Sequence, residues 1–265
     1  PDGSAQHILK SLTFYWTDEE NLKISKLLDF TSSFLTRFHI TEMLTKYFVI
    51  KSSEPMLMVM RPYQIYAVRG CYNRVISSNK NGYVWHCTGS GKTLSSFKLA
   101  TLLRDESRID KCIMLLDRLD LDDQTVDEYN SFEEGCVDQT ENTKVLVDDL
   151  QDDTKTLIKR FRPMMILETK AMEKLKNKRI VFIIDECHRS QFGKMHTAIE
   201  KHFTNANYIG FTGTPIFPQN KAGNGRTTAD LFATYSKNLS ACIATYPIKN
   251  AIADGNVLKF SVEFL

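Results

Sequence analysis

The sequence predicts an α/β fold: a doubly wound, mostly parallel sheet with helices on both faces and a helical extension at the N-terminus. From Gly82 onward, short apolar runs alternate with amphipathic stretches. Runs that are apolar on both faces are typical of strands in a parallel sheet. Two polar motifs directly follow two of these runs, and such sheets bind ligands at the carboxyl ends of their strands. At 265 residues the chain is long enough for one large domain of this kind plus an extension.

Residues 17–48 are predicted to be helical, because leucine, phenylalanine and methionine recur at spacings that place them on one face of a helix. A second helix is predicted from Pro62 to about Ser78, since proline fits the first turn of a helix. We place a domain boundary just before that helix. It separates an N-terminal helical region, residues 1–54, from the main domain, residues 55–265.

Five apolar runs are predicted to form the strands of the sheet. They are Tyr83–Cys87, Cys112–Leu116, Met164–Leu167, Ile180–Ile184 and Tyr208–Phe211. The stretches between them predict crossover connections, which join parallel strands. Acidic and polar residues 133–155 and the glycine- and asparagine-rich residues 219–228 are expected to be exposed loops.

A phosphate-binding loop is predicted directly after the first run. It consists of Thr88, Gly89, Ser90, Gly91, Lys92 and Thr93. The backbone amides of such a loop, and the positive end of the helix that follows, bind the phosphates of a nucleotide. The lysine reaches the β- and γ-phosphates, and the hydroxyl of the final threonine ligates Mg²⁺. The strict motif has glycine six residues before the lysine, where this chain has His86, so only the core of the motif is present.

Two adjacent acids, Asp185 and Glu186, directly follow the run at 180–184. Buried strands seldom end in paired carboxylates unless a metal or a charge receives them. In nucleoside triphosphatases one such carboxylate supports the Mg²⁺ ion, and the other orients the attacking water. With the loop, these acids predict a Mg²⁺-dependent nucleoside triphosphatase in which Lys92, Asp185 and Glu186 are catalytic. His188 is assigned to the same group, with a hydrogen-bonded core histidine as the alternative.

Charge, cysteine spacing and hydrophobicity restrict which other kinds of protein the chain can be. The chain has 34 Lys and Arg against 32 Asp and Glu, a net charge of +2, so any nucleic acid must be bound by a local patch of charge. Its six cysteines show no CxxC pair and no zinc-type spacing, which predicts reduced thiols in the cytoplasm, without disulfides or structural zinc. No apolar stretch reaches the roughly 18 residues of a membrane span, and we expect neither a membrane segment nor an export signal.

Six ordered motifs make the chain resemble the motor (R) subunit of type I restriction enzymes, a superfamily 2 helicase-type ATPase. They are RPYQ at 61–64, TGSGKT at 88–93, DRLDLDDQT at 117–125, DECHRSQFG at 185–193, GFTGTPIFP at 210–218 and DGNVLKF at 254–260. The resemblance implies a RecA-like domain that couples ATP hydrolysis to translocation on double-stranded DNA before cleavage. It also implies Mg²⁺ as cofactor and the methyltransferase (M) and specificity (S) subunits as partners.

The resemblance also implies which domains of an R subunit this chain contains. Residues 1–54 are similar to the connector between nuclease and motor in this family. The nuclease and the second motor domain are then expected to be missing, so that the chain binds nucleotide but hydrolyses it poorly.

Further roles are implied residue by residue. Gln64 would read the adenine through its amide, while Tyr63 or Arg61 would pack against the base. Thr212 and Thr214 would couple the nucleotide site to the DNA. Contacts with the DNA backbone, which suit movement over any sequence, are assigned to Arg118, Gln124, Thr169 and Lys170.

Two other functions are left open. One is a metal-dependent DNA endonuclease, because Asp149 or Asp153, an apolar run, and then Glu168 and Lys170 imitate the acids of such enzymes. Its centre would be Asp153, Glu168 and Lys170. The other is a non-enzymatic docking module, in which the N-terminal helices bind the methyltransferase core and nucleotide is only a structural ligand.

Overall fold

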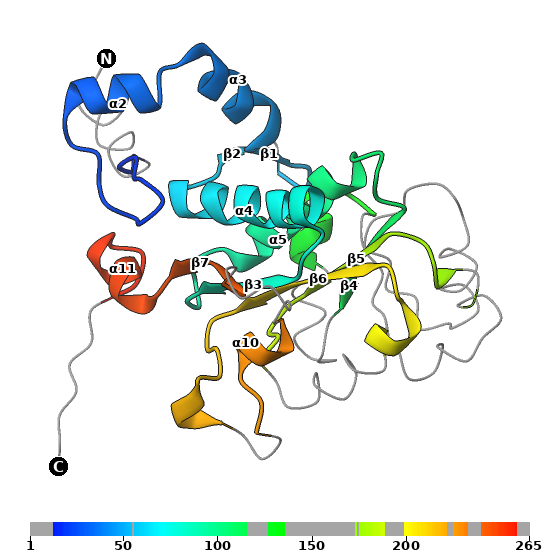
Figure 1. The fold of residues 1–265 in the computed structure, drawn as a ribbon. Helices are drawn as coiled ribbons and strands as arrows, with labels where there is room; N and C mark the ends of the chain where they lie inside the picture. The colour runs from blue at the N-terminus through cyan, green and yellow to red at the C-terminus, as the bar shows by residue number, and fades with distance from the viewer. Residues whose placement is uncertain are drawn as a thin grey trace.

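The computed structural model describes residues 13–54, 56–115, 127–135, 173, 175–188, 199–221, 225–232 and 240–258. They form a five-stranded sheet with helices on both faces, and an N-terminal layer lies above the helices of one face (Figure 1). The doubly wound α/β fold predicted from the sequence is confirmed.

All five strands of the sheet are parallel, in the order β4-β5-β6-β3-β7. Their bounds are Gly82–His86 for β3, Lys111–Leu115 for β4, Ile180–Ile184 for β5, Ala206–Thr212 for β6 and Cys242–Tyr246 for β7. Four of them agree with predicted runs to within two residues, and the run Met164–Leu167 lies outside the described residues. β7 was not predicted, because most of this edge strand is only partly buried and its sequence lacks a long apolar run.

Two long helices cover one face of the sheet. α4, Pro62–Ser78, packs on β3 and β7, and α5, Lys92–Arg104, packs on β4, β5 and β6. α4 has the predicted bounds, with proline in its first turn. The core between these helices and the sheet includes Val68, Leu99 and Ile183, all almost fully buried. Burying such a side chain contributes roughly 1.5–3 kcal/mol.

The opposite face of the sheet is covered by shorter elements. They are α10, Thr228–Leu231, and the helix at 199–202 (Figure 1). Here Phe182 of the sheet packs with Phe203 and Phe232 in a second core. The C-terminal side of the described chain continues from β7 into α11, Ile248–Ala253.

The N-terminal region is helical, as predicted, but residues 17–48 are not one helix. Instead, α2 spans Leu27–Ser33 and α3 spans Arg37–Lys46. Short polar side chains explain why the helix is interrupted. They form hydrogen bonds with nearby backbone groups, which compete with the hydrogen bonds of a continuous helix. Asp18 accepts hydrogen bonds from the amides of Glu20 and Leu22, which makes a turn where helix was expected. Thr36 caps α3 by accepting from the amide of His39.

An antiparallel hairpin follows these helices. β1, Phe48–Lys51, pairs with β2, Met56–Val59. The hairpin is attached to the main domain, because the Ser52 hydroxyl donates to the Phe132 carbonyl, in the helix at 127–132. The domain boundary that we place between residues 54 and 55 falls in its turn.

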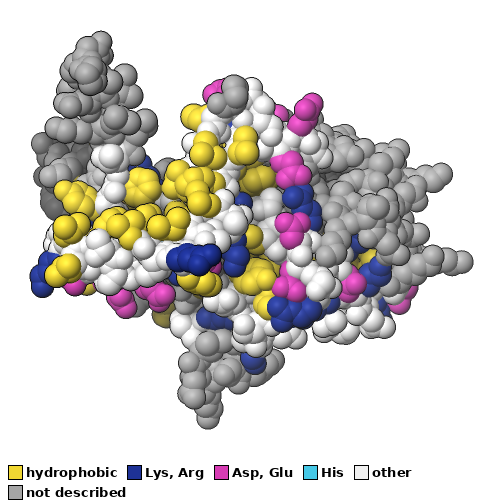
Figure 2. All heavy atoms as spheres, turned by 90° about the horizontal axis from the view of Figure 1, so that it is seen from above, with side chains coloured by type: hydrophobic (Ala, Val, Ile, Leu, Met, Phe, Trp, Pro, Cys, Tyr) yellow, Lys and Arg dark blue, Asp and Glu magenta, His cyan; other side chains and the backbone are white. Residues whose placement is uncertain are grey.

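Exposed hydrophobic side chains gather over α2, α3 and the hairpin when the molecule is viewed from above (Figure 2). We term them the N-terminal apolar surface, which consists of Leu27, Leu28, Leu35, Phe38, Leu44, Ile50, Met56 and Leu57. Most leucines of the predicted helix therefore face outward rather than into a core. No helix in the described part of the chain is long and apolar enough to cross a bilayer.

Candidate functional site

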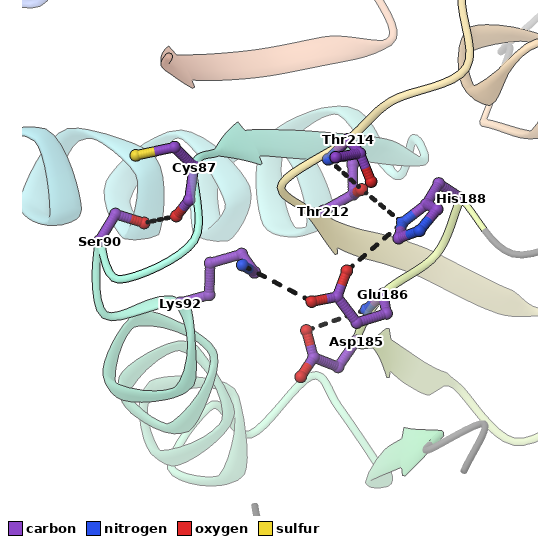
Figure 3. Close-up of polar contacts among 8 residues, drawn as sticks. All are labelled: Cys87, Ser90, Lys92, Asp185, Glu186, His188, Thr212 and Thr214. Carbon is purple, nitrogen blue, oxygen red and sulfur yellow. Dashed lines mark hydrogen bonds and ion pairs between the residues drawn. The ribbon is translucent and has the colours of Figure 1, made fainter. Parts of the chain in front are cut away.

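Neighbouring strands bring the predicted motifs together at one edge of the sheet. The phosphate loop follows β3, and the acidic pair follows β5. The TGTP turn, residues 212–215, begins at the end of β6, which lies between β3 and β5. Because the strands are parallel, their carboxyl ends lie at the same edge. Figure 3 shows the side chains of all three motifs facing one another.

The loop between β3 and α5 has the conformation of an anion site. Gly89 and Gly91 adopt φ angles of 78° and 75°, in the left-handed region that favours glycine. Within the described residues, the backbone amides of Gly89, Gly91, Lys92 and Thr93 donate to no carbonyl. These amides and the positive end of the 13-residue α5 are suited to bind phosphate oxygens.

The N-terminus of α4 supports this loop from behind. The Tyr63 hydroxyl and Gln64 Nε2 each donate to the Ser90 carbonyl at 2.9 Å, and Gln64 Oε1 accepts from the Arg61 amide at 2.9 Å. A Cβ placed on Gly91 would lie 2.5 Å from Gln64 Nε2, so the loop packs tightly on this side chain. The amide of Gln64 therefore contacts the phosphate loop, and its adenine-reading role stays a prediction.

The other side of the loop approaches the TGTP turn. Thr88 and Gly89 are exposed at the rim of the site. A Cβ on Gly213 would lie 3.3 Å from Thr88 Oγ1 and 3.4 Å from the His86 carbonyl oxygen. Glycine at 213 thus lets the two loops lie close together.

Lys92 and Glu186 face each other across the site, with Nζ 3.7 Å from Oε1 (Figure 3). Glu186 has a φ angle of 45°, which is uncommon for a residue with a side chain and is a form of local strain found at functional sites. Its other carboxylate oxygen lies 3.3 Å from His188 Nδ1. The carboxylate of Glu186 therefore lies between the ammonium group of Lys92 and the imidazole ring of His188.

Asp185 is mostly buried beside this pair. Its Oδ1 accepts from the Glu186 amide at 2.9 Å. Burial, together with the Glu186 carboxylate, raises the pKa of Asp185 to about 6, and the Lys92 ammonium only partly opposes this shift. A cation bound next to Asp185 would favour its ionised form.

The side chains present fit Mg²⁺ bound together with a triphosphate. Mg²⁺ usually takes one or two protein ligands and completes its shell with phosphate oxygens and water. Asp185 and the hydroxyl of Thr93, in the first turn of α5, are ligands of that kind. Within the described ranges, no cluster of three or more His, Cys, Asp or Glu is arranged to hold a metal.

One ion pair and two hydrogen bonds connect Glu186 with the TGTP turn by way of His188. His188 Nδ1 lies 2.8 Å from Thr212 Oγ1, which also accepts from the Thr214 amide at 3.1 Å (Figure 3). Thr212 is fully buried, whereas Thr214 is exposed. His188 is half-buried and hydrogen-bonded to Thr212 of the neighbouring motif, and its catalytic role stays a prediction. These contacts connect Glu186 with the exposed Thr214.

Sequence reasoning missed one residue that belongs to this region, Tyr246 at the end of β7. Its ring stacks on that of Tyr63, with centroids 3.6 Å apart, and His86 packs edge-on against both rings. His86 itself is fully buried; burial first, and then Lys92, lower its pKa to about 3, so it is neutral. No motif marks Tyr246, and only the pairing of β7 with β3 brings it to the site.

Other predicted residues lie outside the described part of the chain. They include the DNA-backbone residues Arg118, Gln124, Thr169 and Lys170 and the nuclease residues Asp153 and Glu168. Their roles stay predictions.

The sequence has close relatives of known class. Residues 63–264 match the family described as SWI2/SNF2 ATPase. The type I restriction enzyme SsaAORF53P endonuclease subunit of Staphylococcus saprophyticus is 46% identical over 262 residues, which are 97% of this chain and 27% of that protein. A Mycoplasma pneumoniae protein, described as the C-terminal part of the putative type I restriction enzyme MpnIIP endonuclease, is 40% identical over 71% of this chain and 99% of its own length. The chain spans about a quarter of the length of the staphylococcal relative.

Solved structures share the fold at low sequence identity. A nuclease-deletion mutant of the type ISP restriction-modification enzyme LlaGI, in complex with a DNA substrate mimic, matches with a TM-score of 0.54 and 17% identity, over 75% of this chain and 21% of that one. The DNA-bound type ISP enzyme LlaBIII matches with a TM-score of 0.51 and 17% identity, over 75% of this chain and 16% of that one. These likenesses confirm the RecA-like α/β architecture.

Proposed function

The chain belongs to the endonuclease (R) subunits of type I restriction enzymes and carries a SWI2/SNF2-type ATPase domain, and we propose that this domain binds ATP with Mg²⁺ and couples its hydrolysis to translocation on double-stranded DNA. One observation carries the nucleotide part. Lys92, which is far in the sequence from the adjacent Asp185 and Glu186, meets them at the edge of the sheet where the phosphate loop lies.

Each side chain has a defined task in this proposal. Lys92 leaves Glu186 and binds the β- and γ-phosphates, while the amides of Gly89 and Gly91 contact phosphate oxygens. Thr93 and Asp185 hold Mg²⁺, which when bound neutralises charge on the phosphates. Glu186, released from the lysine, orients the attacking water and accepts its proton.

Coupling to DNA is assigned to the TGTP turn. The contact of Glu186 with His188 and the hydrogen bonds from His188 to Thr212 and from Thr214 to Thr212 give the occupancy of the nucleotide site a physical path to the exposed Thr214. The DNA bound to the solved LlaGI and LlaBIII structures favours DNA as the substrate of this domain as well. Cytoplasmic location follows from the same proposal, since ATP and DNA are found there.

The decisive experiment for nucleotide binding is a thermal-shift titration of the chain with ATP and GTP, each with and without Mg²⁺. A ligand that binds only the folded state stabilises it in proportion to the logarithm of its concentration. We expect stabilisation by ATP that needs Mg²⁺ and that exceeds the effect of GTP. Equal shifts with both nucleotides would remove the adenine preference, and no shift with either would remove the proposal.

Docking to the methyltransferase (M) and specificity (S) subunits is a second function, and the N-terminal apolar surface favours it. Contiguous exposed apolar patches on soluble proteins commonly mark interaction sites. Leu28 and Phe38 are 80% and 78% exposed, so replacing both by serine leaves the fold intact. Pull-down with the M and S subunits should weaken in this double variant, and the Mg²⁺–ATP thermal shift should be unchanged. Retention of the subunits at wild-type level would argue against this surface.

A further inference from the structure

Two stacked tyrosines connect the phosphate loop with the segment that follows α11. The rings of Tyr63 and Tyr246 are stacked, with an interplanar angle of 9°. On the loop side, the Tyr63 hydroxyl donates to the Ser90 carbonyl at 2.9 Å. On the far side, the Tyr246 hydroxyl donates to Asp254 Oδ2 at 2.8 Å and accepts from Asn256 Nδ2 at 2.7 Å. The path from residues 254–256 to the loop thus consists of two rings and their hydroxyl groups.

This connection is buried and has little freedom to adjust. Tyr246 is 0% exposed and Tyr63 is 7% exposed. The backbone carbonyl of Tyr246 also accepts, at 3.0 Å, from the amide of Cys87, the first residue after β3. Tyr246 therefore supports the start of the loop through its backbone and the middle of the loop through Tyr63. In a close-packed interior, a shift of one ring displaces the ring stacked on it.

The far end of the connection is also anchored. Asp254 Oδ1 lies 3.3 Å from Lys23 Nζ, at a partly exposed ion pair. Asn21, two residues earlier, donates its side-chain amide to the Thr245 carbonyl, next to Tyr246. Residues 254–256 thus lie where the N-terminal extension meets the end of β7.

We propose that Tyr246, together with Asp254 and Asn256, positions the phosphate loop through Tyr63, so that nucleotide binding and the conformation of residues 254–256 are coupled. This inference rests on nucleotide binding at the proposed site. Coupling between two sites is reciprocal, so contacts that favour the loop conformation at one end are strengthened by the ligand at the other. Because Tyr246 is argued to act through Tyr63, it is a positioning residue.

The first test is the affinity for MgADP, measured by isothermal titration calorimetry of the chain and of Tyr246→Phe. Phenylalanine keeps the stacked ring and removes only the hydroxyl bonds to Asp254 and Asn256. We expect binding about fivefold weaker, the effect of one typical hydrogen bond. The matched control is Tyr72→Phe, which removes a tyrosine–carboxylate bond to Glu106 near the other end of α4. The control should lose stability without any change in affinity.

A double-mutant cycle tests the route. Tyr63→Phe breaks the bond to the Ser90 carbonyl and should also weaken MgADP binding. If Tyr246 acts through Tyr63, the double variant Tyr63→Phe/Tyr246→Phe should bind about as weakly as Tyr63→Phe alone, because contacts in one network are not additive. If the two losses of MgADP affinity multiply in the double variant, Tyr246 does not act through Tyr63.

Hydrogen exchange of the nucleotide-free chain separates failure of this inference from failure of the proposed function. The Ser90 amide, which donates to the Cys87 carbonyl, should exchange faster in Tyr246→Phe than in wild type and in Tyr72→Phe. If wild type binds no MgADP, the nucleotide proposal fails, and the exchange rates alone decide whether the tyrosines support the loop. Unchanged exchange at the Ser90 amide, or a change in affinity equal to that of Tyr72→Phe, overturns the inference.

Discussion

The ammonium group of Lys92 and the carboxylate of Glu186 form an ion pair, 3.7 Å apart, across the edge of the sheet. The lysine comes from the first turn of α5, and the glutamate comes from the turn after β5. A triphosphate placed on the loop competes for the lysine and leaves the glutamate for a water molecule. In the proposed function, Lys92 therefore binds the phosphates and Glu186 orients the water.

Lys92→Ala should abolish stabilisation by Mg²⁺ and ATP. For the wild type, ligand at a hundredfold excess over its Kd stabilises by about 2.7 kcal/mol, which corresponds to about 5–10 °C in Tm for a chain of this size. Without the lysine, the phosphates lose their main cationic contact, and the shift should fall to near zero. Lys201→Ala, at an exposed lysine on the opposite face, is the control and should keep the full shift.

Asp185→Asn should change how stability depends on pH. The pKa of Asp185 is raised from 3.8 to about 6 in the folded chain, so the folded state holds this proton more tightly than the unfolded state. The resulting stabilisation is complete below about pH 4 and is lost as the pH rises through about 6. Asparagine is neutral throughout, so urea denaturation should find the variant more stable at pH 7.5, on the order of 2 kcal/mol, and equal to wild type near pH 4.

Asp185→Asn should be stabilised less than wild type by Mg²⁺ and ATP, although it is more stable without ligand at pH 7.5. Because Asp185 is expected to hold Mg²⁺, the thermal shift with Mg²⁺ and ATP should be smaller in Asp185→Asn than in wild type. A difference in stability that is constant from pH 4 to pH 7.5, or an undiminished shift, would contradict these assignments.

Gly91→Ala should destabilise the chain more than Gly89→Ala. Both glycines have left-handed φ angles, so either alanine costs about 1–2 kcal/mol. A Cβ at 89 meets nothing within 4 Å, whereas a Cβ at 91 lies 2.5 Å from Gln64 Nε2. That amide is fixed by bonds to Arg61 and Ser90, and displacing it adds about 1–3 kcal/mol. Chemical denaturation measures both variants, and the difference should disappear in the Gln64→Ala background.

Thr212→Val should cost about 1–3 kcal/mol, because it leaves the amide of Thr214 and the ring of His188 without their shared partner. Thr212→Ser keeps the hydroxyl and should lose less. Thr214→Val, at an exposed side chain, should stay within about 0.5 kcal/mol of wild type in the same urea titration. If Thr212→Val and Thr214→Val lose equal stability, the hydrogen bonds of the Thr212 hydroxyl are not the cause of the loss.

The sequence was sufficient for the features that depend on local pattern. The apolar run at 180–184 gave the bounds of β5 without error, and proline at 62 gave the start of α4. The convergence of Lys92 with the acids followed from the rule that parallel strands share their carboxyl edge. What the sequence lacked was a signal for tertiary contacts. β7 is an edge strand, and its hydrophobic pattern is weak because most of it is only partly buried. Leu27 and Leu28 have the spacing of a buried helix face although both are exposed.

The bond from Gln64 to Ser90 shows the same limit at the level of one residue. A motif assigns a type of side chain to a place in the chain, but it does not say which of several nearby polar groups that side chain contacts. Here the Ser90 carbonyl takes both donors from α4.

The hairpin between α3 and α4 bears on where the chain can be cut. A version of this protein that starts at residue 55 would keep β2 and lose β1, its hydrogen-bonding neighbour. Met56 and Leu57 would then lie on an open strand edge, which invites pairing with other molecules. Shortened versions that begin ahead of Phe48 should stay monodisperse, whereas those that begin after it should self-associate.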